Sequence, residues 1–543
     1  MPRLLSLAIS VTLLPGAALG QHEHIATAAP AGSVPLFDDL GSYHHAITTS
    51  SPEAQRYFDQ GLRLLYGFNH DEAERALREA ARLDPDCAMA WWGIAFALGP
   101  NINVPIDPER NTKALDAVAK AQAASGKANA REQAYVDAIA KRYSPDPRAD
   151  RAALDQAFAT AMGELSRAFP DDLDAATLYA EAMMDLRPWK LWNADGTSAP
   201  GTEQIVAVLE SVLKRNPDHP GANHYYVHAT EASPHPERAL ASAERLKTLV
   251  PGAGHLVHMP AHTFMRTGDY VGAVQANAIA AKVDEAYIQK SGVQGVYPLM
   301  YYNHNLHFLA LAAAMAGQSA AARDAAIKVA ANAAPVVKEM PMAEFLLPAP
   351  YYVALRFQRW DEVLAFPEPD GAFVATRALR HYARALARLA KGEGVDDERA
   401  AFAALRAQVP ADALFNLNPS RAVLDVAAAV LDARVASAHG DAEAAIAAWR
   451  KAVEAEALLS YDEPPIWYYP VRESLGAELL RAGRGSEAEA VFRDDLAHNP
   501  KNGRSLFGLW KSLEAQEKPA AAARKEFEAA WKAADVPLRL EDL

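Results

Sequence analysis

The segment YFDQGLRLLYGFNHDEAERALREAARLDP, residues 57–85, decides the fold class of this 543-residue chain. It holds the small residues Gly61, Ala73 and Ala80 and ends at Pro85, so that these residues occupy positions 8, 20, 27 and 32 of one repeat. A helical hairpin with a period of about 34 residues has its small packing residues and its proline at these places. The spacing therefore predicts a helix-turn-helix repeat.

Two further copies of this pattern follow. The C-terminal copy is carried by Gly476, Ala488, Phe492 and Pro500. In the centre, Pro217 and Pro251 are 34 residues apart and fix a repeat over residues 220–253. Each copy resembles a tetratricopeptide repeat (TPR), and helical periodicity fills most of the remaining sequence. We therefore expect an all-α protein, a right-handed superhelical solenoid of about twelve TPR-like helix pairs.

The repeats predict three parts, with the irregular stretches between them as loops. The parts are N-terminal TPR-like repeats over residues 51–219, histidine-rich central repeats over residues 220–336 and C-terminal TPR-like repeats over residues 337–543. Three insertions interrupt the period, at residues 99–108, 188–201 and 288–302. Loops longer than a repeat requires are often functional, so we expect these insertions to cover the groove of the solenoid.

The N-terminus has the pattern of an export signal. Arg3 precedes an apolar stretch over residues 4–14, and Ala18-Leu19-Gly20 forms a small-residue cleavage site. We expect a signal peptide over residues 1–20, a flexible leader over residues 21–50 and a periplasmic or secreted protein. No later stretch is long and apolar enough to predict a membrane span.

Composition excludes several classes of protein. Half of the residues are hydrophobic, which argues against a disordered chain. The 54 basic and 68 acidic residues leave a net charge of −14, so no nucleic-acid partner is expected. Cys87 is the single cysteine and has no partner for an internal disulfide, so packing alone must hold this fold.

Four motifs also make the chain similar to a family of exported bacterial TPR proteins of unassigned activity. The motifs are Phe68-Asn69-His70, the stretch DPDCAMAWWG over residues 84–93, His258-Met259-Pro260-Ala261-His262 and Asp462-Glu463-Pro464-Pro465. The resemblance covers most of the sequence after the signal and implies the repeat fold. It implies no reaction.

Histidine is concentrated in the central repeats. Nine of the 17 histidines lie between His219 and His307. In the register set by the prolines, seven of them occupy positions 2, 5 or 9 of three successive repeats: His224, His228, His255, His258, His262, His304 and His307. These positions lie roughly 140° from the packing face of a helix, so the imidazoles are predicted to point together into the concave groove.

Converging imidazoles with a carboxylate indicate a metal site. Glu231 lies at position 12 of the same repeat as His224 and His228. Imidazole nitrogen and carboxylate oxygen suit zinc or copper, and also iron or nickel. The sequence predicts one or two transition-metal ions held by the seven histidines and Glu231, with two ions slightly favoured.

Three functions fit this prediction. A metalloenzyme would use an ion with an open position, with Glu231 as ligand or general base. A metal storage or trafficking protein would need the ligands alone. A protein-interaction scaffold would bind a protein or peptide partner in the groove, and the histidines would then tune its pH response.

One segment outside the histidine repeats is a candidate pocket wall. Residues 461–472, YDEPPIWYYPVR, are aromatic and contain three prolines. Such a stretch suits a rigid connector that leads into a repeat. The alternative is a second wall opposite the histidines, which requires the superhelix to curl far enough to bring the segment there.

Overall fold

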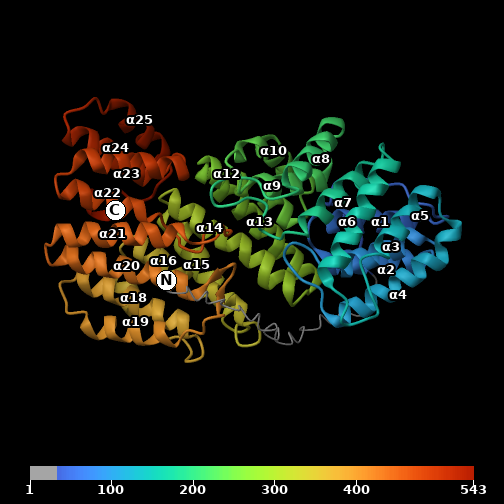
Figure 1. The fold of residues 1–543 in the computed structure, drawn as a ribbon, viewed down its shortest axis with the longest axis horizontal. Helices are drawn as coiled ribbons and strands as arrows, with labels where there is room; N and C mark the ends of the chain where they lie inside the picture. The colour runs from blue at the N-terminus through green and yellow to red at the C-terminus, as the bar shows by residue number, and fades with distance from the viewer. Residues whose placement is uncertain (1–33) are drawn as a thin grey trace, which may run out of the picture.

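Helices form nearly all of the regular structure of this chain (Figure 1). The computed structural model describes residues 34–543. Within that range most helices pack on the helix that follows, and the one sheet is a hairpin in which β1 (Leu414–Phe415) pairs with β2 (Asn418–Pro419). The predicted all-α solenoid is confirmed.

The helices fall into consecutive groups along the chain. The N-terminal group is α1 (Pro52–Tyr66), α2 (His70–Leu83), α3 (Ala88–Leu98), α4 (Pro108–Ala124), α5 (Ala130–Ile139), α6 (Arg151–Ala168), α7 (Leu173–Met184) and α8 (Thr202–Arg215). The central group is α9 (Pro220–Thr230), α10 (Leu240–Leu249), α11 (Gly254–His258), α12 (Pro260–Thr267), α13 (Tyr270–Ser291), α14 (Asn303–Met315) and α15 (Ser319–Ala333). The C-terminal group is α16 (Ala349–Arg356), α17 (Trp360–Ala365), α18 (Val374–Ala390), α19 (Asp396–Gln408), α20 (Ser420–Ala438), α21 (Ala442–Ala457), α22 (Val471–Arg481), α23 (Gly485–His498), α24 (Gly503–Ala515) and α25 (Ala521–Ala530). Short helical turns are η1 (Ser125–Lys127), η2 (Pro236–Ala239), η3 (Tyr297–Tyr302), η4 (Pro341–Leu346) and η5 (Leu540–Asp542).

Glycine at the eighth repeat position lets neighbouring helices touch. A Cβ atom on Gly61 of α1 would lie 2.5 Å from Cγ of Leu77 in α2. In the C-terminal copy, a Cβ atom on Gly476 of α22 would lie 2.5 Å from Cζ of Phe492 in α23. A Cβ atom on Gly508 of the following helix, α24, would lie 2.2 Å from the same atom. A large side chain of the second helix thus fills the space that the glycine leaves, which is the packing expected from the repeat spacing.

Two large apolar cores share the chain. One is built from residues 40–301 and the other from residues 270–543. A smaller cluster includes Phe264 of α12 and Phe308 of α14. Helices α9, α12, α13 and α14 lie in the middle of the molecule (Figure 1), so the histidine-rich helices are found where the two cores meet. The division of the chain at residues 219 and 336 stays a prediction.

The start of the described chain packs on the helices, whereas we expected a flexible leader up to residue 50. Phe37 N donates to Oε1 of Gln60 in α1 at 2.8 Å, and His45 Nδ1 lies 2.6 Å from Oδ2 of Asp174 in α7. Asp174 is distant in sequence, so no local pattern marks this contact. The predicted signal peptide and residues 21–33 lie outside the described residues. Among the described helices, none has the length and apolar character that crossing a bilayer requires.

Candidate metal centre

The predicted histidines come from four helices. They are His224 and His228 of α9, His255 and His258 of α11, His262 of α12, and His304 and His307 of α14. We expected one continuous helix from residue 254, but α11 ends at His258 and α12 begins at Pro260. Proline has no N–H to donate to the preceding turn, which explains the interruption.

The first group of imidazoles, triad 1, consists of His224, His228 and His255. One ligand atom of each lies within 4.8 Å of the others, and the Nε2 atoms of His224 and His255 are 3.1 Å apart. His224 Nδ1 donates to the carbonyl oxygen of Tyr66 at 2.7 Å, which leaves the lone pair of the neutral ring on Nε2. The Phe68 ring packs on all three imidazoles at centroid distances of 4.5, 6.0 and 5.4 Å.

The second group, triad 2, consists of His258, His262 and His304. Their ligand atoms also lie within 4.8 Å of one another, and the Nε2 atoms of His258 and His262 are 2.7 Å apart. His258 Nδ1 donates to Oδ1 of Asn277 in α13 at 2.5 Å. The Phe308 ring lies 4.8, 4.6 and 5.0 Å from the three imidazole centroids. One phenylalanine ring therefore packs against the three imidazoles of each triad.

Glu231 joins the two triads. It caps the C-terminus of α9 and is buried. Its Oε1 accepts from His228 Nδ1 of triad 1 at 2.7 Å, and its Oε2 accepts from His262 Nδ1 of triad 2 at 2.5 Å. The two oxygens of one carboxylate thus orient a ring in each triad.

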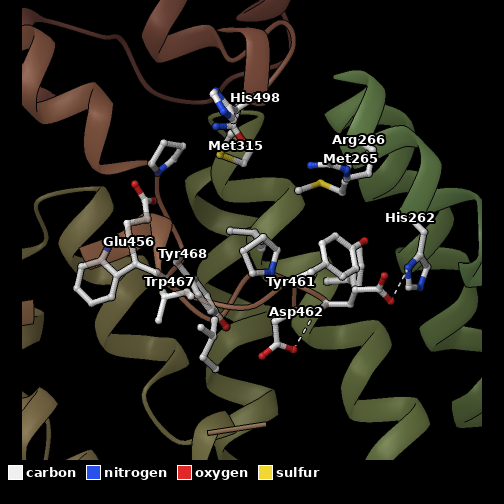
Figure 2. A pocket seen from close by; sticks show the side chains of 18 of the residues that line it. His262, Met265, Arg266, Met315, Glu456, Tyr461, Asp462, Trp467, Tyr468 and His498 are labelled. Atoms are coloured by element: carbon white, nitrogen blue, oxygen red, sulfur yellow. Dashed lines mark hydrogen bonds and ion pairs between the residues drawn. The ribbon is translucent and has the colours of Figure 1, made fainter. Parts of the chain in front are cut away.

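A second carboxylate comes from the distant segment 461–472. Glu463 Oε2 lies 2.9 Å from His262 Nδ1, and Glu463 Oε1 is buried with no hydrogen-bond partner among the described residues. Figure 2 shows Tyr461 and Asp462 of this segment on the side of the pocket that faces His262. The segment forms a wall opposite the histidines, which was the alternative to a simple connector.

Two other polar residues lie apart from the triads. The His307 ring packs on Phe345 and Tyr468 at centroid distances of 5.7 and 5.3 Å, and His307 belongs to neither triad. Asp185, at the C-terminal end of α7, pairs with Arg142 at 2.5 Å. The structure therefore brings six of the seven predicted histidines and Glu231 into one site and leaves His307 at its side.

Burial keeps most of these imidazoles neutral. It lowers the pKa of His228 and of His307 to about 3. Burial and the neighbouring imidazoles hold the pKa well below its usual range in His224, His255, His258 and His304. In His262 burial again opposes the charge, but the carboxylates of Glu231 and Glu463 outweigh it and raise the pKa to about 10. Neutral imidazole is the form that binds metal, so an ion at triad 2 would displace a proton from His262.

The triads have the donor set and the spacing of transition-metal sites. Ligands of a tetrahedral ion with bonds of 2.0–2.1 Å are separated by about 3.3 Å. The closest nitrogen pairs, at 3.1 and 2.7 Å, are near this value. Three imidazoles leave one tetrahedral position for water or substrate. The rings donate hydrogen bonds to Tyr66, Asn277 and Glu231, and these acceptors orient them as the outer partners of metal ligands do.

Five residues that contact the triads were not among the predicted site residues: Tyr66, Phe68, Asn277, Phe308 and Glu463. Phe68 and Glu463 lie in motifs that carried the family resemblance, and this was the sequence feature that could have marked them as site residues. Asn277 had none, because its contact with His258 depends on how α13 packs on α11.

Comparison with known proteins does not assign the chain to a family. No protein-family model and no curated protein matches it. Structures similar to it include the human IFIT1 dimer with m7Gppp-AAAA, at 12% identity and a TM-score of 0.31, covering 83% of this chain and 90% of that one. The TPR domain of P58(IPK) is 11% identical with a TM-score of 0.20 and coverages of 86% and 98%. Yeast Tom70 is 13% identical with a TM-score of 0.27 and coverages of 89% and 92%. Values this low carry no argument about activity.

Proposed function

We propose that this protein binds two transition-metal ions, one in each triad, with the carboxylate of Glu231 between them. The observation that carries the proposal is the convergence of six imidazoles from four helices into two groups with ligand atoms within 4.8 Å. Burying polar rings against one another is costly unless they share a proton or a cation. A cation at each triad would satisfy the nitrogens that face one another.

Zinc and copper suit this site best. Imidazole nitrogen is a good ligand for both, and the single cysteine of the chain, Cys87, is not among the grouped ligand residues. A mixed group of His228, Glu231, His262 and Glu463 also lies within 4.8 Å, and such a nitrogen and oxygen set also accepts iron or nickel.

The arrangement favours catalysis over storage. A bound ion with an open position supplies Lewis acidity and lowers the pKa of a water ligand. Both oxygens of Glu231 are engaged by imidazoles, so this carboxylate acts as a positioning residue in our proposal. Glu463, a second buried carboxylate 2.9 Å from His262 Nδ1, is the proton acceptor in our proposal, and burial with the nearby Glu231 raises its pKa. Storage would need no such group.

We also place the protein in the periplasm or outside the cell, on the signal pattern of residues 1–20. Sequencing the N-terminus of protein recovered from the periplasm or the medium is the test. A chain that begins at Gln21 would support export, and a cell-retained chain that keeps Met1 would contradict it.

Elemental analysis tests the metal proposal. The mature protein should be purified without a polyhistidine tag and should contain about two equivalents of metal. His224→Ala and His258→Ala should each leave about one equivalent, and the double variant almost none. His439→Ala is the matched control, because His439 is exposed and outside both triads.

Each outcome distinguishes among the three candidate functions. Less than about a tenth of an equivalent after reconstitution would contradict both metal functions and leave the protein-interaction scaffold. Loss of both ions from a single variant would contradict separate sites. Metal content without turnover of esters, phosphoesters, peptides or phenols would favour storage or trafficking.

A further inference from the structure

A cavity of about 430 Å³ opens beside the triads. Its walls include residues from all three insertions that we expected to cover the groove: Ile102 to Val104, Pro188 to Lys190, and Val296 with Leu299 to Tyr301. The hairpin residues Asn416 and Leu417 and the carboxylates Asp462 and Glu463 complete the enclosure. The cavity is thus built by segments that the helical repeat itself does not need.

The floor of the cavity is polar and belongs to the metal centre. His228, His255 and His304 face it from the two triads. His228 Nε2 and His255 Nδ1 are buried without a hydrogen-bond partner among the described residues. A molecule in the cavity can therefore reach ligand atoms of both triads.

The walls are mostly apolar. They include Leu299, Met300, Phe345 and Leu346. At the rim, Met342 and Leu417 are 43% and 36% exposed, which is unusual for large apolar side chains. Lys190 is the only lysine or arginine among the described lining residues, and it is exposed. This lining disfavours a phosphate-rich ligand and favours a molecule with an apolar body.

His307 supplies a further polar contact. It lines the cavity while its ring packs on Phe345 and Tyr468. His307 is 2% exposed, and its Nε2 has no hydrogen-bond partner in the described part of the chain. A buried nitrogen of this kind is costly unless a ligand pairs with it.

We propose that this cavity binds the substrate, a small organic molecule with an apolar chain or ring and one polar end. The polar end lies on the triads, and the apolar body lies against the walls out to Met342 and Leu417. His307 hydrogen-bonds the polar end and is not a metal ligand. The volume falls in the range of roughly 300–1,000 Å³ that is typical of small-molecule sites. The position of the polar end rests on the proposed metal function, whereas the binding of the apolar body does not.

Straight-chain hydroxamates are suitable probes, because the head binds metal and the tail length can be varied. Calorimetry should compare acetohydroxamate, hexanohydroxamate and octanohydroxamate on metal-loaded protein whose metal content is measured on the same sample. Affinity should rise about fourfold for each added methylene, since each buried methylene contributes about 0.8 kcal/mol. Leu417→Glu should remove this dependence on chain length.

Two further variants make the test specific. Leu414→Glu is the matched control, because Leu414 is also exposed and lies on the same hairpin but does not line the cavity. His307→Leu should weaken all the hydroxamates by a similar factor of about two to ten, the value of one hydrogen bond, with the metal content unchanged. Loss of metal from His307→Leu would overturn its role as a ligand-binding residue.

Metal-loaded protein that binds hydroxamates equally at all chain lengths would overturn the cavity proposal and leave the metal function standing. If the protein takes up no metal, the metal function fails and primary alcohols of the same lengths replace the hydroxamates. A chain-length dependence that Leu417→Glu removes and Leu414→Glu retains would still support the cavity. If affinity for the alcohols does not depend on chain length, the cavity proposal is overturned.

Discussion

Single side chains decide how the two triads are oriented. Glu231 is the clearest case, because each of its oxygens accepts from a different imidazole and both triads depend on it. Tyr66 and Asn277 serve one triad each, through His224 and His258. A change at Glu231 should therefore affect both ions, whereas a change at Asn277 should affect triad 2 alone.

Glu231→Gln should weaken metal binding at both triads by about 10- to 100-fold, the usual effect of losing an outer partner of a ligand. Glutamine keeps one acceptor oxygen, but its NH2 group replaces the other oxygen. One of the two imidazole N–H groups then faces a donor and loses its hydrogen bond. Competition with a chromogenic chelator measures the two affinities. Glu237→Gln, at an exposed glutamate of η2, should leave them unchanged. Weakening at one triad only would show that Glu231 does not bridge the two.

Asp284 predicts a pH dependence of the stability of the fold. Burial raises its pKa from 3.8 to about 7, although Tyr297 and Asn305 donate to it. The folded state thus binds the proton more tightly than the unfolded state, and this stabilisation is lost as the pH rises through about 7. Between pH 5 and 8 the wild type should lose about 3 kcal/mol of unfolding free energy that Asp284→Asn does not lose.

Urea unfolding of both proteins at pH 5, 6.5 and 8 measures that difference. The quantity compared is the change of unfolding free energy with pH. The absolute unfolding free energy is not compared, because Asp284→Asn also removes a hydrogen-bond acceptor. Parallel slopes would mean that Asp284 is ionised in the folded protein at pH 5.

At the scale of helices, close contacts at glycine set the spacing of the repeats. Phe492 of α23 lies between Gly476 of α22 and Gly508 of α24, and no room remains for a Cβ atom at either glycine. Gly476 and Phe492 carried the repeat pattern in the sequence, so their contact was predictable from spacing, whereas Gly508 was not part of that pattern.

Gly508→Ala should destabilise the protein by about 1–3 kcal/mol, the usual cost of overpacking. Thermal unfolding measures it, with Gly126→Ala as the control because open space surrounds Gly126. Phe492→Leu should cost less in the Gly508→Ala background than in the wild type, because the smaller side chain relieves the clash. Equal costs in the two backgrounds would contradict direct contact.

The histidine site shows what repeat spacing can and cannot predict. The register placed His224, His255 and His258 on one face because helical periodicity is local. The interruption at Pro260 was not anticipated, although proline itself signals it. Glu463 and Asn277 reach the site through the curvature of the whole chain and the crossing of α13. Those depend on the sum of many small packing angles, which no local pattern encodes.

At the scale of the molecule, the two triads lie between two apolar cores. His224 belongs to α9, which packs in the core of residues 40–301, and His304 belongs to α14, which packs in the core of residues 270–543. An ion in triad 2, which joins His258 of α11 to His304 of α14, would link the two halves of the solenoid.

Metal should therefore stabilise the folded chain as a whole. At free metal about a thousandfold above the dissociation constant, each site adds about 4 kcal/mol to the unfolding free energy. Differential scanning calorimetry of loaded and chelator-treated protein should show a higher midpoint for the loaded form. The His224→Ala, His258→Ala double variant should show no such difference. A rise in that variant would place the stabilising ion elsewhere.

The walls of the cavity beside the metal centre include the three insertions, the hairpin and the 461–472 segment. Its floor is formed by imidazoles that the helices carry. Loops of this kind tolerate changes of length and sequence far better than packed helices do. Evolution can therefore alter what the cavity admits without touching the frame that holds the reactive centre. Descendants of one ancestral solenoid can diverge in the molecules they accept and still keep the same imidazoles.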